Sequence, residues 1–486
     1  MVGMEEEEEE QRRPPVSPFG VYFNSSSISL AVLAVLEIEE PINIPHSRLV
    51  FLLDTLLLRV HPRFSSVIVT GKDGEQRWKR VEVNLKDHIK TAIFPENRSP
   101  EYYEERFSSY LSEISAELFL GNRPLWEIHF VKYPTTNAAG NVIFKIHHAI
   151  GDGYSLMAAL LSCFKRSDDP SLPLTFPDIR IRSSGDAGGG KKAAVARALA
   201  SAFNTVSDLW TSFSKTKLLA DDLSPVRSGE TGVGFRPISA ATMAFSLDQI
   251  KQIKSKLGMT VNDVVTGTVF LGTRMYMKEM EPGSEEAETT SIVVLNTRML
   301  RSYNSVHDMM MSKATESPWG NHFAFLHVGL PKLMVGGATG NYDDNNGARQ
   351  ESTMARRSLE FLKATQKLIQ KKRSSVAVHL NGRLIQLYRK LRGSEAASSY
   401  VYWAVKNTSM AITNMIGPTE KMTLADHHVK GLYFLLAGNP QNLTITMVSY
   451  MGQMRVSIGT EKGFIDPNKL KSCIQRAFDL ILNSTC

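Results

Sequence analysis

Residues 142–153 of this chain of 486 residues read VIFKIHHAIGDG, and residues 154–161 continue as YSLMAALL. The β-branched and aromatic residues before the two histidines predict a strand, and the apolar run after Gly153 predicts a helix. The Gly-Asp-Gly segment between them is typical of a tight turn. A strand end holds an imidazole in a fixed position, and histidine takes up a proton near neutral pH because its ordinary pKa is about 6.5.

The two glycines beside Asp152 let the backbone turn sharply, so its carboxylate can point back toward the strand and brace an imidazole or the loop. The same residues also suit a strand–turn–helix junction that has no chemical role. Successive strand residues point to opposite faces, so at most one of His147 and His148 lines a cleft. The spacing alone does not choose between them.

Residues 147–153 resemble the HHxxxDG motif of the CoA-dependent acyltransferase superfamily, and their context resembles the plant wax ester synthase/diacylglycerol acyltransferase family. Supporting segments follow in the family's order, namely RPLWE at 123–127, VNDVV at 261–265, NTR at 296–298, PWGN at 318–321 and TNMIGP at 413–418. The resemblance covers approximately residues 17–482. The ordered set is far more specific than the motif alone.

The order of strands and helices predicts an α/β protein. The resemblance implies a two-lobe, chloramphenicol-acetyltransferase-like α/β fold with a tunnel between the lobes. We expect four parts: a disordered acidic tail at 1–16, an N-terminal lobe with HHxxxDG at 17–182, a linker and amphipathic crossover helix at 183–233, and a C-terminal lobe at 234–486.

Periodicity predicts further elements. Helices are expected over residues 48–60, 101–118, 247–257, 263–277, 354–371 and 376–391, with a closing helix that carries Leu470, Ile474, Phe478 and Ile481. Strands are expected over residues 66–70, 78–83, 123–133, 292–295, 409–413, 432–436, 443–450 and 454–459.

The resemblance implies an O-acyltransferase that moves a fatty acyl group from acyl-CoA to a long-chain alcohol, to diacylglycerol, or to both. It implies that His148 accepts the proton of the acceptor hydroxyl. No Gly-x-Ser-x-Gly nucleophile elbow is evident, which favours direct transfer without an acyl-enzyme. Acyl-CoA is then a substrate, and no cofactor is expected.

The other candidate site residues have supporting roles. The resemblance implies a structural role for Asp152, paired with Arg298 across the two lobes, and Gly153 belongs to the same turn. Asn262 is either an N-cap or a residue of the substrate channel. Thr413, Asn414 and Asn321 are either donors to a developing oxyanion or turn residues.

Two rival classes stay open. One is a catalytically inactive lipid-binding or regulatory homologue. The other is a metal hydrolase that uses His147, His148 and Asp152, although adjacent strand histidines diverge and a third ligand with recognisable spacing is missing. We therefore expect no metal site.

Composition gives weaker indications. A net charge of +7, without a long basic run, favours anionic partners such as a membrane surface or CoA phosphates, and nothing indicates nucleic-acid binding. Cys163, Cys473 and Cys486 are too few for a disulfide framework, which favours a reducing, cytosol-facing location. The acidic start does not resemble a secretory signal.

Two segments carry open alternatives about partners. Residues 199–213 place aromatic and apolar side chains on one helical face, so residues 196–219 form either an in-plane membrane contact or an interdomain helix. Residues 371–373, Lys-Lys-Arg, either meet CoA phosphates or lie at a solvated helix end. We expect a peripheral or weakly anchored protein at the cytosolic face of the endoplasmic reticulum, at the plasma membrane, or at both.

Overall fold

The computed structural model describes residues 13–175, 214, 219–296, 319–333, 347–373 and 377–485. Several sequence predictions lie outside these residues: most of the acidic tail, most of the segment at 196–219, and Arg298. Every other candidate site residue lies inside them.

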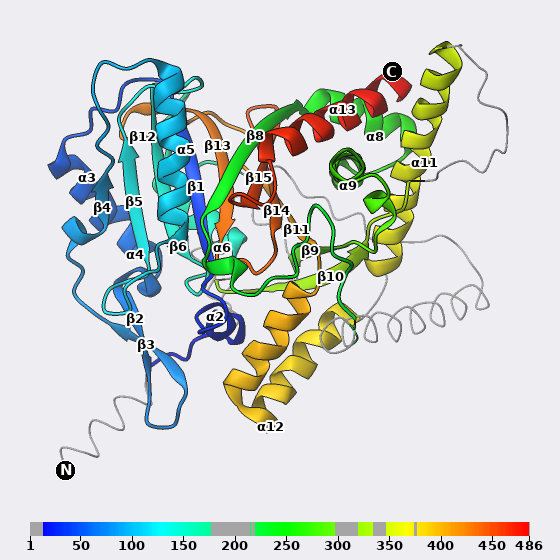
Figure 1. Ribbon diagram of the computed structural model, residues 1–486. Helices are drawn as coiled ribbons and strands as arrows, with labels where there is room; N and C mark the ends of the chain where they lie inside the picture. Colours follow the sequence, from blue (N-terminus) through cyan, green and yellow to red (C-terminus); the bar gives the residue numbers. More distant parts are fainter. Residues whose placement is uncertain are drawn as a thin grey trace, which may run out of the picture.

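The first sheet runs in the order β4-β5-β6-β1-β13-β12-β7 within the described part of the chain (Figure 1). Helix α5 packs against one face and helix α6 against the other. Strands β1, β5 and β6 are buried at every position. Strand β1 is almost continuously apolar, whereas β5 and β6 also bury polar side chains, among them Glu127, His129 and Lys145. The elements contributed by the first half are β1 (Ala31–Ile38), β4 (Ile89–Thr91), β5 (Trp126–Val131), β6 (Gly140–His147), β7 (Lys165–Arg166), α5 (Pro100–Ala116) and α6 (Gly153–Ser162).

Shorter elements surround this sheet. Helix α2 (Pro18–Phe23) begins after Ser17, and a hairpin joins β2 (Ser66–Thr70) to β3 (Gln76–Arg80). A continuous helical segment consists of α3 (His46–Leu52), the π-helical turn Leu53–Leu57 and α4 (Leu58–Val60). It ends at His61, as the sequence predicts.

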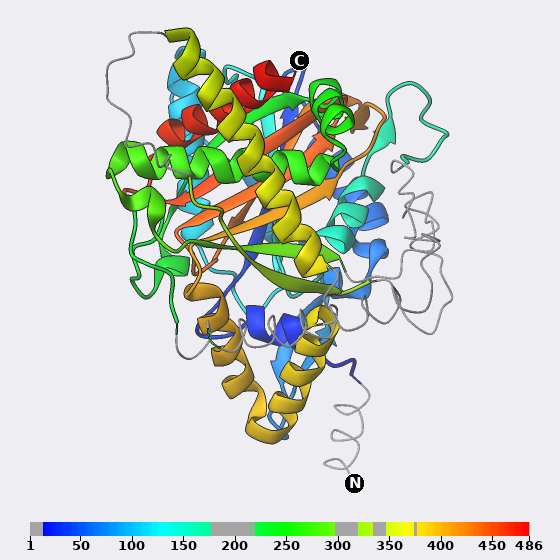
Figure 2. The same cartoon turned by 90° about the vertical axis from the view of Figure 1, so that its right-hand side faces the viewer.

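The second sheet has the order β10-β9-β11-β14-β15-β8. Its strands are β8 (Ile238–Ser246), β9 (Thr290–Asn296), β10 (Phe323–Gly329), β11 (Met410–Ile416), β14 (Leu443–Tyr450) and β15 (Gln453–Glu461). One hydrophobic core joins the sheet to four helices, α8 (Leu247–Leu257), α9 (Val261–Met280), α11 (Gly347–Arg373) and α13 (Pro467–Thr485). Figure 2 shows α9, α11 and α13 lying across this sheet.

A strand from the second half of the chain completes the first sheet. Strand β13 (His427–Ala437) pairs along β1 from Ala31 to Ile38, and β12 (Met422–Leu424) follows at its edge. Gly438 ends the crossing with a φ of 86°, and an added Cβ there would lie 1.8 Å from the backbone oxygen of Ser29. The two lobes therefore share one sheet. The chain leaves that sheet at residue 438, where only glycine fits.

The expected domain boundaries need three corrections. Residues 14–16 belong to the fold rather than to a tail, because the backbones of Pro14 and Val16 bond along β3 and Val16 is buried. Residues 219–233 pack on the second lobe, where Asp221 accepts hydrogen bonds from the Thr290 amide and the Ser409 hydroxyl. The segment 234–486 is not one lobe, because β12 and β13 join the first sheet.

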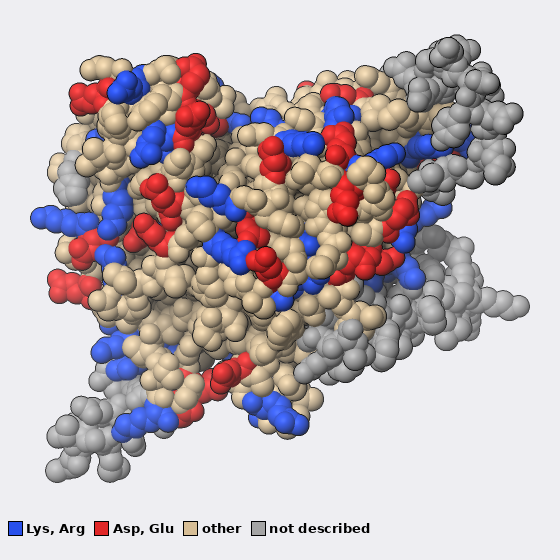
Figure 3. Space-filling model, viewed as in Figure 1, with Lys and Arg blue, Asp and Glu red and all other residues tan. Residues whose placement is uncertain are grey.

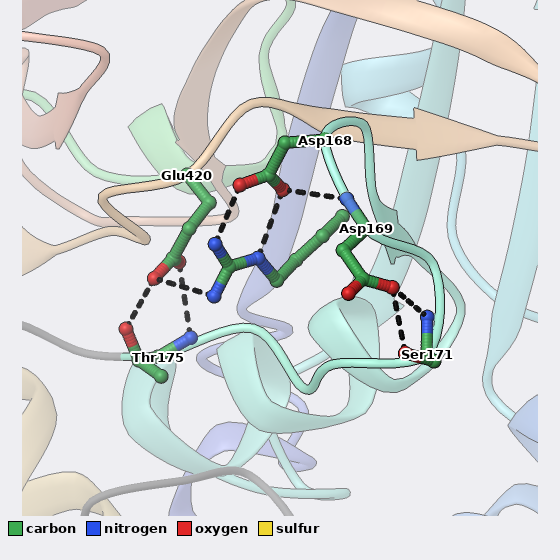
Figure 4. A network of polar contacts seen from close by, with 6 residues as sticks. Asp168, Asp169, Ser171, Thr175 and Glu420 are labelled. Carbon is green, nitrogen blue, oxygen red and sulfur yellow. Dashed lines mark hydrogen bonds and ion pairs between the residues drawn. The ribbon is translucent and has the colours of Figure 1, made fainter.

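The loop after α6 is attached to the start of β12. Arg166 pairs with Asp168 and Glu420, and Glu420 also accepts hydrogen bonds from the backbone and side chain of Thr175. Asp169 accepts hydrogen bonds from Ser171 within the same loop (Figure 4). This network is a second connection between the two halves of the chain.

Helix α12 (Ala377–Lys406) forms two arms that project from the body of the protein (Figure 1). Gly393, with a φ of 86° and a ψ of 170°, breaks the helix between them. The sequence prediction ended the helix at residue 391 and so missed the second arm.

Acidic and basic side chains are interspersed over the face in Figure 3. In the described part of the chain, no helix is both long enough and apolar enough to cross a membrane.

Candidate active site

His148 lies directly after β6 and faces a cavity. Its backbone amide donates to Leu30 O at 2.8 Å, which continues the pairing between the two central strands. Phe144, Ile146 and His148 alternate along the chain and all line the cavity. The rings of Phe23 and Phe323 meet the imidazole edge to face, with centroids 5.0 and 5.8 Å away.

Asn321 fixes the tautomer of His148. Asn321 Nδ2 lies 3.2 Å from His148 O and 3.3 Å from Ser17 Oγ. Because a carbonyl oxygen only accepts, the NH2 group must face it, which turns Asn321 Oδ1 toward His148 Nδ1 at 3.1 Å. Nδ1 therefore carries the proton and donates it, and Nε2 has a free lone pair. Within the described ranges, no hydrogen bond is made to Nε2.

Burial keeps this imidazole neutral. Desolvation lowers the pKa of His148, and the charge of Asp152, a backbone hydrogen bond and the bond from Asn321 oppose the shift. A neutral imidazole with an unprotonated Nε2 is the form that a general base requires.

His147 lies on the opposite face of the sheet. Its Nδ1 accepts from the Ala149 amide at 3.1 Å, its Nε2 lies 3.4 Å from Ser29 Oγ, and its ring meets Phe119 edge to face. Burial, with smaller contributions from His148 and Lys145, lowers the pKa of His147 to about 3. His147 does not line the cavity, and rings on opposite faces cannot ligate one ion together.

Asp152 joins helix α6 to the second half of the chain. Its Oδ1 caps the helix by accepting from the Ser155 amide at 3.0 Å, and its Oδ2 accepts from the His322 amide at 2.9 Å. The charge of Asp152 also acts on the half-buried Arg63, whose Nη1 donates to Ile150 O at 2.8 Å. The expected partner Arg298 lies outside the described residues, so that pair stays a prediction.

Gly153 begins helix α6 in a tight space. An added Cβ would lie 2.7 Å from Met415 Sδ, on the strand β11 of the second sheet. A residue without a side chain therefore lets the helix approach that strand closely.

The cavity has a volume of about 470 Å³ and lies between the two sheets and helix α6. Its walls are mostly apolar, with aliphatic and aromatic side chains from both halves of the chain. Polar side chains also line it, and they are His148, Asp152, Tyr154, Asn262, Arg373, Thr413, Asn414, Asn439 and Gln441.

Asn262 and Asn414 meet at the cavity wall, where Asn414 Nδ2 donates to Asn262 Oδ1 at 3.3 Å. Thr260, not Asn262, caps helix α9, and Asp263 completes a capping box with it. The N-cap alternative for Asn262 is therefore wrong. Thr413 lines the cavity next to this pair, whereas Asn321 holds His148 from outside the lining.

Two contributors to the site were not predicted. Ser17 caps α2 and accepts from Asn321, and Arg63 packs over the Trp78 ring beside the motif turn. The Ser17–Pro18 pair matches the start of a helix, with a capping serine followed by proline, so this signal was available in the sequence. Arg63 gave no comparable signal, because only the tertiary fold brings it to the motif.

Comparisons with known proteins identify related sequences. The "Wax ester synthase/diacylglycerol acyltransferase catalytic domain" model matches residues 21–265, and the "WS/DGAT C-terminal domain" model matches residues 319–482. The wax ester synthase/diacylglycerol acyltransferase 4 of Arabidopsis thaliana is 29% identical over 84% of this chain and 79% of its own length. Number 11 from the same plant is 28% identical over 94% and 92%.

Solved structures show the same fold. The wax ester synthase/diacylglycerol acyltransferase from Marinobacter aquaeolei VT8 superposes with a TM-score of 0.58 at 16% identity, over 97% of this chain and 100% of its own. The TRI3 trichothecene 15-O-acetyltransferase from Fusarium sporotrichioides gives 0.56 at 12% identity, over 98% and 94%. The match of the catalytic-domain model over half of the sequence shows that this chain belongs to the wax ester synthase/diacylglycerol acyltransferase family.

Proposed function

We propose that this chain transfers a fatty acyl group from acyl-CoA to the hydroxyl of a long-chain alcohol or of diacylglycerol, with His148 as general base. The observation that carries the proposal is the hydrogen bond between His148 Nδ1 and Asn321 Oδ1 at a mostly apolar cavity, because it leaves Nε2 as the unprotonated nitrogen. Family membership supports the reaction class.

The reaction proceeds by direct transfer. The alcohol oxygen attacks the thioester carbonyl carbon while His148 Nε2 takes the hydroxyl proton, and negative charge develops on the carbonyl oxygen. Collapse of this intermediate breaks the carbon–sulfur bond. The departing CoA thiolate takes the proton from the imidazolium, so the products are an ester and free CoA, and His148 is neutral again.

The surrounding residues have separate roles in this reaction. Asn321 is a positioning residue that holds the Nδ1–H tautomer, and Asp152 holds the motif turn against the second half. The Thr413 hydroxyl and the Asn262 amide are the candidates for oxyanion donors, because both line the cavity and the bond from Asn414 is made to the oxygen of Asn262.

Acyl-CoA and the alcohol reach His148 from different ends of an interlobe tunnel. Arg373 supports a phosphate-binding end, because this exposed cation at the end of α11 also lines the cavity. Arginine recognises phosphate oxygens through its planar fork of N–H groups.

Purified protein incubated with labelled acyl-CoA and either hexadecanol or diacylglycerol tests the function. Formation of wax ester or triacylglycerol that His148→Ala abolishes supports the proposal. A folded protein that binds acyl-CoA and forms neither ester is an inactive lipid-binding homologue. Activity that a metal chelator removes points instead to the metal-hydrolase class.

Because the proposed substrates are apolar lipids, we expect the protein to dock at the surface of the endoplasmic reticulum or the plasma membrane. Leu387 and Leu391 on the first arm of α12 are 53% and 72% exposed, and Lys390 and Arg392 beside them are also exposed. Apolar and basic side chains together match the chemistry of an anionic lipid surface.

Flotation with phosphatidylserine vesicles tests this surface. The double substitution Leu387→Glu and Leu391→Glu is expected to weaken binding at least about tenfold, since it removes apolar area and adds negative charge. Ile93→Glu, at an exposed residue of the first lobe, is the matched control. Equal binding by both variants contradicts docking through α12.

A further inference from the structure

One face of the first sheet forms a layered floor for the cavity. Across β6, β1 and β13, the residues Ile146, Val32 and Leu436 pair in one row, and Phe144, Ala34 and Phe434 pair in the next. All six line the cavity. Directly paired residues point to the same face, so the rows lead away from His148 along the strands.

Helix α6 forms the opposite wall. Gly153, Leu156, Met157 and Leu160 line the cavity and recur at the spacing of one helical face. The helix begins at the motif turn and runs away from His148, as the floor does. Seven residues of helix from Gly153 to Leu160 advance about 10 Å, and four strand residues from His148 to Phe144 advance about 14 Å. Floor and wall therefore have similar lengths.

The floor closes at the following row. Leu36 pairs there with Val142 on one side and Leu432 on the other. Along the same face of β1 the exposed fraction falls from 9% at Ala34 to 0% at Leu36. Neither Leu36 nor Val142 lines the cavity, whereas Leu432 does and forms its end wall. Ala34 is thus the last residue of β1 that borders open space.

Ala34 is also the smallest side chain of its row, between two phenylalanines. The Cβ atoms of directly paired residues lie about 5 Å apart, so a larger side chain at Ala34 would occupy the gap between the two rings. The side chains of the floor and of α6 that surround this gap are apolar. Such a groove fits an unbranched alkyl chain and no polar group.

We propose that the alkyl chain of one of the two substrates lies along this floor and that Ala34, closed off by Leu432, sets the length it accepts. This inference rests on the proposed acyltransferase function and names a residue that determines its specificity. An extended chain advances about 1.3 Å per carbon because a carbon–carbon bond measures about 1.5 Å. The floor to the Ala34 row then holds about ten carbons.

The test uses graded substitutions and two substrate series. Ala34→Val, Ala34→Leu and Ala34→Phe are assayed with acyl-CoAs from octanoyl to stearoyl at one alcohol, and with alcohols from octyl to octadecyl at one acyl-CoA. The readout is the ratio of kcat/KM on the longest chain to that on the shortest. In one series only, this ratio is expected to fall progressively, at least about tenfold for Ala34→Phe. That series identifies whether acyl chain or alcohol occupies the groove.

Two further variants keep the result decisive. Leu432→Ala opens the closed end, so the same ratio is expected to rise. Ala244→Leu adds the same side chain at an exposed position of β8, away from the cavity, and is expected to leave both ratios unchanged. The proposal is overturned if Ala34→Leu and Leu432→Ala leave both ratios unchanged while their melting temperatures stay close to that of the unmodified protein.

Failure of the proposed function is recognised separately. If the unmodified protein forms no ester with any substrate, the function fails whatever Ala34 does. The same acyl-CoAs and alcohols are then titrated by calorimetry, and the ratio of dissociation constants replaces the ratio of kcat/KM. A chain-length dependence of binding that Ala34→Leu does not alter contradicts the groove.

Discussion

At the scale of single residues, the proton on His148 depends on Asn321. Asn321→Asp keeps an acceptor for Nδ1–H but adds a negative charge at about 3 Å, which raises the pKa of the imidazole. Because only neutral His148 acts as a base, the acidic limb of kcat/KM against pH is expected to move to higher pH. In the unmodified enzyme this limb lies below pH 6.5, since burial lowers the pKa of His148. Measurement of both pH profiles checks the shift, and coincident limbs contradict the role of Asn321.

His147 provides a prediction about stability. Its pKa is lowered to about 3 in the folded protein, so the unfolded chain, with a pKa of about 6.5, binds the proton first. The stabilisation is therefore complete above pH 6.5 and is lost as the pH falls toward 3. Between pH 6.5 and 5, it decreases by about 2 kcal/mol.

Urea denaturation at several pH values tests this loss. In His147→Gln the free energy of unfolding is expected to depend less steeply on pH, by about 1.4 kcal/mol per pH unit below pH 6. The unmodified protein, measured in the same buffers, is the reference. Parallel pH dependences in the two proteins show that His147 is not held neutral by the fold.

At the scale of elements, Asp152 serves as both the cap of α6 and the acceptor for the His322 amide. Asp152→Ala removes both hydrogen bonds. It is expected to lower the free energy of unfolding by about 1 kcal/mol for the lost cap and by about 1–3 kcal/mol for the unsatisfied amide. Ser246→Ala, which removes only the cap of α8, is the matched control at about 1 kcal/mol. Denaturant unfolding of the two variants measures the difference, and equal losses exclude the link through His322.

The elements also show how far the sequence predicts the fold. Strong periodicity located α5, α8, α9, α11 and α13 to within several residues. It missed β8, whose Ala, Ser and Thr residues carry little hydrophobic contrast, and β10. It assigned no strand to residues 31–38, because a strand buried on both faces lacks alternation.

The candidate site was predicted unevenly for similar reasons. The motif located the strand end, the turn and His148, because these are local in the chain. The choice between two histidines needed the resemblance, and the roles of Asn321, Ser17 and Arg63 needed tertiary contacts over many residues of separation. Long-range partners leave no spacing in a sequence.

At the scale of the whole molecule, the crossing of β13 into the first sheet makes the lobes interdependent. We expect urea unfolding to give one transition, with the same midpoint by tryptophan fluorescence and far-ultraviolet circular dichroism. Gly438→Ala, which places a Cβ against Ser29 O, is expected to lower both midpoints together. Two separated transitions, or a shift in one probe alone, contradict this interdependence.

The central claim is that the Nε2 of His148 takes the proton of the acceptor hydroxyl, and a single-turnover transfer assay of His148→Ala tests it most directly. With acyl-CoA and alcohol saturating, the rate is expected to fall about 10²–10⁴-fold while the protein stays folded, and added imidazole is expected to restore part of it. A folded His148→Ala protein that transfers the acyl group within about threefold of the unmodified rate contradicts the account.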